Sequence, residues 1–234
     1  GLGVDSWYLA QRSEAVLHNE ADGLLSESVR QNFEALGTMN ISHRSTMVVP
    51  GNVNDVLDGF APDVVFMDPA RRSDTGKKVF LIEDCQPDTL GLKDEIFGIC
   101  RWMFLKLSPM ADITMAVERL GNVSEVHTVA TGGECKELLI VMDREKQEEG
   151  YRLFVHDSGE TIEFDPQEER CATVVLPRKA SGAPEDGAGL PGGTNGIVGM
   201  ILFEPGKALG KAGVPNSLCD RFNLVKLVRL TNLY

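Results

Sequence analysis

The sequence DVVFMDPARR at residues 63–72 decides the fold class. Residues 64–67 form a short, continuous apolar run, which is typical of a parallel strand that is buried on both faces of its sheet. Asp68 and Pro69 end this run, so a carboxylate follows the strand directly and the proline fixes the backbone beside it. Ligands of open α/β sheets bind beyond the carboxyl ends of the strands, which makes Asp68 a candidate site residue.

Short apolar runs alternate with amphipathic stretches on both sides of this segment, up to about residue 144. The pattern predicts helices at residues 5–13, 23–36, 93–103 and 112–120, and strands at residues 15–19, 46–49, 63–67, 104–107, 125–130 and 137–142. Strands and helices that alternate with short links indicate parallel crossovers, and therefore a doubly wound, mostly parallel α/β sheet. The turn residues 131–133 lie between the last two strands, which predicts a hairpin with one antiparallel strand at the edge of the sheet.

The pattern changes after residue 147, and we predict a domain boundary between residues 147 and 148. The C-terminal part reads as a small α+β domain, with a hairpin at 151–164, a glycine-rich loop at 181–196, a strand at 197–203 and a short helix at 207–212. Residues 1–147 would then form the ligand-binding domain and residues 148–234 the small domain.

Composition excludes several classes of protein. The 234 residues hold 23 basic and 35 acidic residues, a net charge of −12, which excludes a surface that is basic throughout. Residues 204–234 have five basic residues against Glu204 and Asp220, a local excess that could contact an anionic partner. Five cysteines without a CxxC pair, and four histidines without helical spacing, give no reason to expect a metal site or disulfides. Without an apolar stretch of 18 residues or a signal peptide, we expect a cytoplasmic protein that is not bound to a membrane.

Glycines and an acid near the start of the chain suggest a nucleotide-like ligand. Gly1 and Gly3 stand directly before a predicted helix, where a backbone without side chains lets a ligand approach the helix N-terminus. Glu20 ends the next strand, 17 residues after Gly3, where a carboxylate can accept hydrogen bonds from both ribose hydroxyls. A tight turn and a surface acid would explain these residues separately, but together they favour a nucleoside cofactor.

These segments resemble class I S-adenosylmethionine-dependent methyltransferases, and more narrowly the bacterial subgroup with a C-terminal THUMP-like domain. The resemblance rests on GLGVDSWYLA, DPARR, VFLIEDCQPD, KLSPMADI, ECKELL and FEPGKALGKAG, which are spread from residue 1 to about residue 213. It implies a Rossmann-like methyltransferase sheet, S-adenosylmethionine as cofactor and RNA as the acceptor. The first strand of that sheet would precede Gly1, so we expect the sequence to be a fragment that lacks an N-terminal region.

The resemblance also implies which residues hold the cofactor. Gly1 and Gly3 would lie against its methionine part, with Asp5 as a polar neighbour. Glu20 would hold the ribose, and Asn52 would lie beside the adenine.

The methyl-transfer side of the site would be formed by the DPARR segment. Asp68 and Pro69 match the motif beside the transferable methyl group, with Asp68 as the proton acceptor for an amine or hydroxyl. Amino-methyltransferases usually have a second proline and an aromatic residue next, where this chain has Ala70 and Arg71. Base stacking by this motif is therefore not expected, and the substrate side is assigned to the cations Arg71, Arg72 and Lys106.

Four alternatives remain open at this point. The acceptor could be a small molecule or a protein instead of RNA. Cys85 would be the nucleophile if the acceptor were a pyrimidine carbon, although a small buried residue is the simpler interpretation. A non-catalytic RNA-binding or scaffold module could keep the same fold. A nicotinamide-dependent dehydrogenase is the weakest alternative, because Ser6 occupies the place of the third glycine in GxGxxG.

Overall fold

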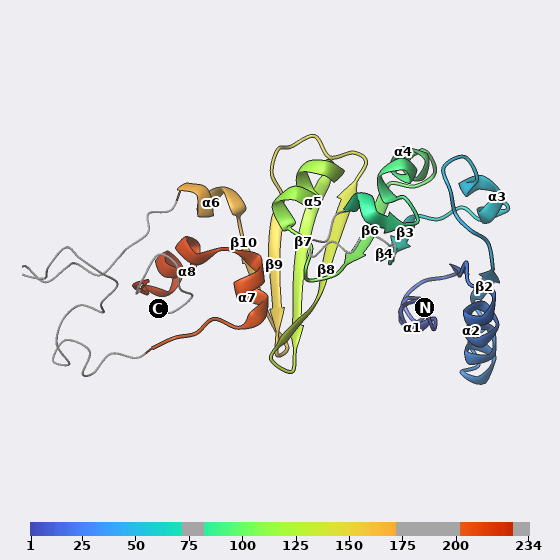
Figure 1. Ribbon diagram of the computed structural model, residues 1–234, viewed down its shortest axis with the longest axis horizontal. Helices are drawn as coiled ribbons and strands as arrows, with labels where there is room; N and C mark the ends of the chain where they lie inside the picture. Colours follow the sequence, from blue (N-terminus) through green and yellow to red (C-terminus); the bar gives the residue numbers. More distant parts are fainter. Residues whose placement is uncertain (72–81, 172–201, 227–234) are drawn as a thin grey trace, which may run out of the picture. The chain divides into compact units, whose positions relative to one another are not determined.

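The computed structural model describes residues 1–71, 82–171 and 202–226 (Figure 1). The chain divides into two compact units, and the boundary predicted between residues 147 and 148 remains a prediction. One unit consists of Gly1–Lys106, Met110–Asn122 and Met142–Glu145, and the other of Leu107–Pro109, Val123–Val141 and Lys146–Tyr234. No helix in the described ranges is long and apolar enough to cross a membrane.

From residue 1 to residue 120, short strands alternate with helices. The elements are α1 (Val4–Ala10), β1 (Val16–Asn19), α2 (Gly23–Ala35), β2 (Ile41–Arg44), α3 (Val53–Leu57), β3 (Val64–Met67), β4 (Ala70–Arg71), the 3₁₀ helix η1 (Ile82–Asp84), β5 (Cys85–Gln86), α4 (Thr89–Ile99), β6 (Trp102–Leu107) and α5 (Ile113–Leu120). β1 pairs with β2 and β3 pairs with β6, both in parallel, while β4 and β5 are antiparallel. The predicted α/β fold with parallel crossovers is confirmed.

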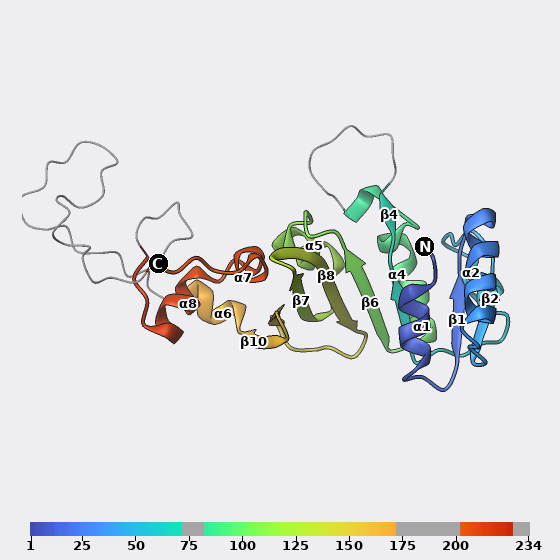
Figure 2. The same cartoon turned by 90° about the horizontal axis from the view of Figure 1, so that it is seen from below.

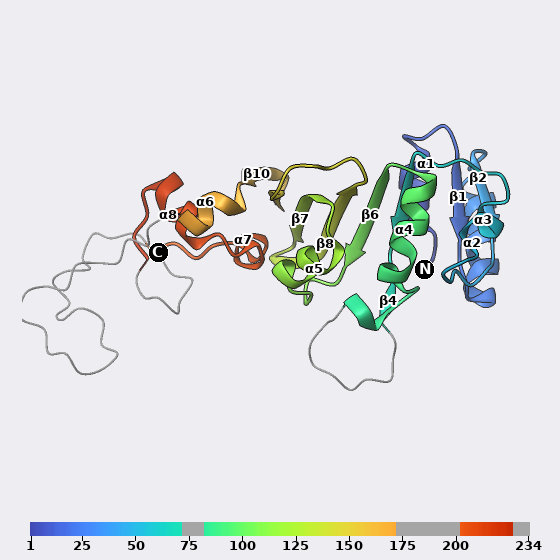
Figure 3. The same cartoon turned by 90° about the horizontal axis from the view of Figure 1, so that it is seen from above.

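Aspartates fix where three of these helices begin. The carboxylates of Asp22, Asp88 and Asp112 each accept a hydrogen bond from a backbone N–H in the first turn of α2, α4 and α5, respectively. Such caps satisfy N–H groups that have no partner within the helix. α2 then buries Val29 and Phe33, one turn apart, and both α1 and α2 pack on the β1–β2 pair (Figure 3).

Two predicted elements were wrong. The second strand is Ile41–Arg44 and not residues 46–49, because the latter form a loop whose backbone bonds to asparagine side chains. The helix predicted at 93–103 begins earlier, at Thr89, because Asp88 caps it, and it ends where Cys100 adopts an extended conformation. Only Cys100 and Arg101 separate this helix from β6, and both elements are rich in apolar residues, so periodicity alone could not locate the boundary.

The second unit is built around the strands β7 (Val123–Thr131), β8 (Glu134–Asp143), β9 (Arg152–Asp157) and β10 (Glu160–Phe164), in the order β10-β9-β7-β8. Its helices are α6 (Pro166–Cys171), α7 (Lys207–Ala212) and α8 (Pro215–Phe222). β7 pairs with β9 in parallel and β9 with β10 antiparallel, which confirms the hairpin predicted at 151–164. Gly132 and Gly133, both at positive φ, make the two-residue turn of the predicted β7–β8 hairpin.

The expectation that this hairpin forms the edge of the sheet was wrong, because the sheet continues from β7 into β9 and β10. One face of β7 and β9 is apolar, with Val126, Leu153 and Val155 almost fully buried, and α7 packs on these two strands (Figure 2). The buried Thr128 hydroxyl donates to the Ala208 carbonyl of α7 over 3.2 Å. α7 coincides with the helix predicted at 207–212, whereas the glycine-rich loop at 181–196 and most of the predicted strand at 197–203 lie outside the described residues.

Candidate functional site

Two carboxylates and one ammonium meet at the carboxyl ends of β3 and β6. In this parallel pair Met67 lies opposite Leu105, so the next residues, Asp68 and Lys106, are neighbours as well. Lys106 Nζ lies 3.0 Å from Asp68 Oδ2 and 2.7 Å from Asp5 Oδ2, in the first turn of α1. The Lys106 side chain is 17% exposed, whereas the side chains of Asp5 and Asp68 are about half exposed.

The two carboxylates keep Lys106 protonated. Burial disfavours its ammonium form, but the hydrogen bonds to Asp5 and Asp68 outweigh that effect and raise the pKa of Lys106 above its usual value. With two carboxylates and one ammonium, the cluster has a formal charge of −1. A cationic ligand would therefore be attracted to these strand ends more than an anionic one.

Gly1, Gly3 and Glu20 form a second group. Glu20 directly follows β1, and its carboxylate accepts hydrogen bonds from the backbone nitrogen of Gly1 and from the N–H of Asp22. Gly3, at φ 82°, precedes α1, and a Cβ atom there would lie 2.8 Å from the Phe33 ring. The glycine turn and the acid at the strand end thus lie together.

Asn52 uses its side chain within its own loop. Its Oδ1 accepts from the backbone N–H of Val49 and its Nδ2 donates to the carbonyl of Met47, both over 2.9 Å. The structure therefore gives this residue the task of shaping the loop before α3, and does not bring it into the cluster around Lys106.

The remaining predicted residues are described only in part. Pro69 is buried directly after Asp68. Arg71 contributes its backbone to β4 opposite Cys85, but its side chain and the whole of Arg72 lie outside the description. Cys85 is 1% exposed, which favours its interpretation as a small buried residue.

Sequence reasoning missed two side chains that organise the loop between β2 and α3. Asn19 exchanges two hydrogen bonds with the backbone of Thr46, over 2.9 and 3.1 Å. Glu95, on α4, accepts from the backbone N–H groups of Gly51 and Val53 over 2.7 and 2.9 Å. Asn19 could have been found from its place at the end of a predicted strand, but nothing in the sequence distinguishes Glu95 from other helical acids.

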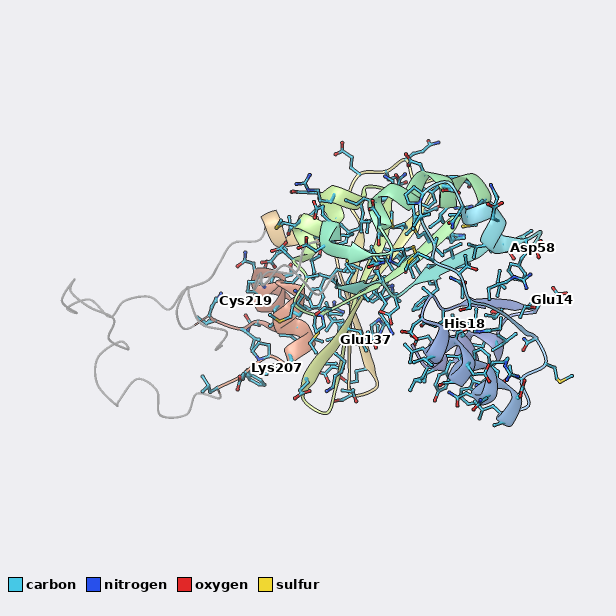
Figure 4. All side chains as sticks on the ribbon, turned by 45° about the vertical axis from the view of Figure 1, so that its right-hand side comes forward. Glu14, His18, Asp58, Glu137, Lys207 and Cys219 are labelled. Carbon is cyan, nitrogen blue, oxygen red and sulfur yellow. The ribbon has the colours of Figure 1, made fainter. Side chains whose placement is uncertain are left out.

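Sequence reasoning also missed a pair of histidines on β1 and β2, close to Glu20. His18 on β1 lies opposite His43 on β2, with their rings stacked at 5.4 Å between centroids (His18 is labelled in Figure 4). His18 Nδ1 bonds to the hydroxyl of Ser6 in α1 over 2.7 Å, and His43 Nε2 to that of Ser26 in α2 over 2.6 Å. Burial, together with the neighbouring His43, lowers the pKa of His18 to about 4, so the pair is neutral at pH 7 and fastens two helices to the strands.

Within the described ranges no three His, Cys, Asp or Glu side chains gather where they could hold a metal ion.

The fold is a Rossmann-like methyltransferase fold. It matches the crystal structure of a "putative methyltransferase" from Porphyromonas gingivalis over 100% of this chain and 54% of the other, with a TM-score of 0.81 and 26% sequence identity. This chain thus spans about half the length of that protein. No protein-family model matches the chain, and neither does any curated protein sequence.

Other solved structures are more distant. A predicted O-methyltransferase from Agrobacterium tumefaciens matches 68% of this chain and 79% of the other at 16% identity, with a TM-score of 0.45. An rRNA methylase from Streptococcus thermophilus matches 62% of this chain and 82% of the other at 15% identity, with a TM-score of 0.43. Neither likeness is strong enough to support an argument about function.

Proposed function

We propose that this chain is part of an S-adenosylmethionine-dependent methyltransferase. The observation that carries the proposal is the cluster of Asp5, Asp68 and Lys106 at the ends of two parallel strands, the position where this class of fold holds its ligand. The whole-chain likeness to the Porphyromonas gingivalis protein supports it.

The chemistry of the residues fits this cofactor. S-adenosylmethionine has a cationic sulfur, and a site with two carboxylates and one ammonium is complementary to it. Glu20 offers carboxylate oxygens to the two ribose hydroxyls, and each oxygen can accept a second hydrogen bond beside those it already has. Gly1 and Gly3 would let the backbone lie against the methionine part, and Asn52 would stand on the adenine side.

The residues on the reactive side would align the acceptor and manage its proton. The bound cofactor supplies a methyl group on a positively charged sulfur, and the transfer is an in-line displacement. Asp68 would orient the attacking amine or hydroxyl and take its proton after transfer. Lys106 would hold the Asp68 carboxylate in place, and Pro69 would fix the backbone from which that carboxylate projects.

For the acceptor we favour RNA, held at a few local contacts. The net charge of −12 limits the number of phosphates the chain can contact. Arg71, Arg72 and Lys106 would meet the acceptor near the methyl group. Residues 148–234 would be the THUMP-like domain, and the basic excess at residues 204–234 within it would hold more distant RNA. In the described part of this segment Lys207 and Arg221 are exposed, and Arg221 also donates to the Glu163 carbonyl, whereas Lys226 is buried.

A non-catalytic RNA-binding or scaffold module is the second candidate. It is favoured by one departure from the family pattern, since Ala70 and Arg71 stand where a proline and a stacking aromatic residue are usual. Such a module would bind RNA or cofactor without transferring a methyl group.

The deciding experiment is a calorimetric titration of the full-length native protein with S-adenosylhomocysteine. We expect micromolar binding that falls by about 10- to 100-fold in Glu20→Ala, since the carboxylate makes hydrogen bonds of about 1.5–3 kcal/mol as a charged group. Glu14→Ala is the matched control, because Glu14 is an exposed acid just before β1 (Figure 4) and should leave the affinity unchanged. Absence of binding to the wild type would refute the methyltransferase proposal. Where binding is found, transfer of labelled methyl groups to RNA would separate the enzyme from the module.

A further inference from the structure

Three side chains form hydrogen bonds with the backbone of the loop at residues 45–53, between β2 and α3. Asn19, at the end of β1, donates a hydrogen bond to the carbonyl of Thr46 and accepts one from its N–H. Asn52 closes the middle of the loop on itself through Val49 and Met47. Glu95 of α4 holds its far end, so the loop is shaped by side chains from two neighbouring elements as well as by its own.

The contact made by Glu95 is the most specific of the three. One carboxylate oxygen accepts from the N–H of Gly51 over 2.7 Å and the other from the N–H of Val53 over 2.9 Å. Val53 begins α3, and its N–H would have no partner within that helix. A carboxylate that accepts two backbone hydrogen bonds also has the charge that suits a helix N-terminus.

The same face of α4 is shaped to receive the loop. Gly91 lies one turn before Glu95, and a Cβ atom at that position would approach Pro50 Cγ to 3.1 Å. The missing side chain of Gly91 therefore lets Pro50 lie close to the helix while Glu95 bonds to the two following backbone amides. Gly51, between them, adopts φ 96°, a conformation that favours glycine.

We propose that Glu95 is a positioning residue for the adenine side of the cofactor site. This inference rests on the proposed function, which places the adenine beside Asn52. Glu95 would not touch the cofactor; it fixes the backbone on either side of Asn52 before the cofactor arrives. A loop that is ordered in advance lowers the entropy lost on binding, so the effect should appear in affinity.

The test compares Glu95→Ala and Glu95→Gln with the matched control Asp94→Ala in the full-length protein. Asp94 is the neighbouring acid on α4 and is exposed. Titrations with S-adenosylhomocysteine and with adenosine are made well below the melting temperature of each variant. We expect Glu95→Ala to weaken both ligands by about tenfold, which corresponds to about 1.4 kcal/mol, with Glu95→Gln intermediate and Asp94→Ala within twofold of the wild type. Amide exchange at Gly51 and Val53 should become faster in Glu95→Ala, even without ligand.

Three results would overturn the inference. A lower melting temperature with unchanged affinity for both ligands would reduce Glu95 to a structural residue. Unchanged amide exchange at Gly51 and Val53 would show that the carboxylate does not hold the loop. If the wild type binds neither ligand, the proposed function is refuted, and so is the role of Glu95 in cofactor binding. Faster amide exchange in Glu95→Ala would in that case still show that Glu95 holds the loop, so that only the proposed function was wrong.

Discussion

Replacement of Lys106 by methionine would test the charge cluster directly. Methionine keeps most of the aliphatic stem, so the packing of the residue is largely retained while the ammonium is lost. The interactions that disappear include those at 2.7 Å to Asp5 and at 3.0 Å to Asp68. The two carboxylates lose their shared counterion but remain about half exposed, so water can solvate them in the variant.

The loss of stability expected for Lys106→Met lies between two limits. An ion pair on the surface contributes at most about 1 kcal/mol, whereas removing one partner of a fully buried pair costs about 3–5 kcal/mol. Lys106 is mostly buried but its partners are not, so solvent screening keeps each interaction near the surface value. We therefore expect Lys106→Met to lower the free energy of unfolding by about 2 kcal/mol at pH 7. Because the pKa of Lys106 is raised on folding, this contribution is fully present at neutral pH and is lost only as the pH rises past the usual lysine value.

Urea unfolding measures the difference, with Lys136→Met as the control. Lys136 pairs with Glu134 at the exposed start of β8, and we expect no measurable change when it is replaced. The reasoning would be refuted if the two variants were equally stable, or if Lys106→Met lost more than about 4 kcal/mol, as expected for a buried and uncompensated charge. A double-mutant cycle with Asp68→Asn would then assign the share that belongs to that carboxylate.

Two further predictions concern stability. Folding lowers the pKa of His18 from 6.5 to about 4, so between these pH values the unfolded chain binds a proton that the folded protein does not. The free energy of unfolding is therefore unaffected by His18 above pH 6.5 and falls as the pH drops towards 4. The fall would be about 3 kcal/mol, and partial solvent access reduces it to about 2 kcal/mol. Unfolding measured from pH 7 to pH 4.5 should show this slope, and an equally steep slope in His18→Gln would contradict the assignment. Gly3→Ala should cost about 3 kcal/mol, because it combines a left-handed backbone with a Cβ atom 2.8 Å from the Phe33 ring. Gly37→Ala, with φ 64° and open space around it, should cost about 1 kcal/mol, and equal losses at the two sites would exclude the clash with Phe33.

Local signals in the sequence were sufficient for much of the fold. The helix at Gly23–Ala35 could be predicted because apolar residues recur at its period and Asp22 and Gly37 mark its ends. The apolar run at 64–67 and the turn at 158–159 located β3 and the β9–β10 hairpin for similar reasons. β2 has the sequence ISHR, without an apolar run, and its place depends on pairing with β1. No local pattern could have found it.

Even less of the candidate site than of the fold could be predicted from local sequence patterns. Attention to the strand ends identified Asp68 and Lys106 one at a time, and the role of Asp5 came from the family resemblance. Their pairing depends on the register in which Met67 lies opposite Leu105. A shift of one residue would turn Lys106 to the other face of the sheet and leave both carboxylates without it. Asp5 and Lys106 are 101 positions apart in the sequence, so they become one charged group only in the folded protein. The variants of Lys106 therefore test whether the fold brings these three side chains together as described.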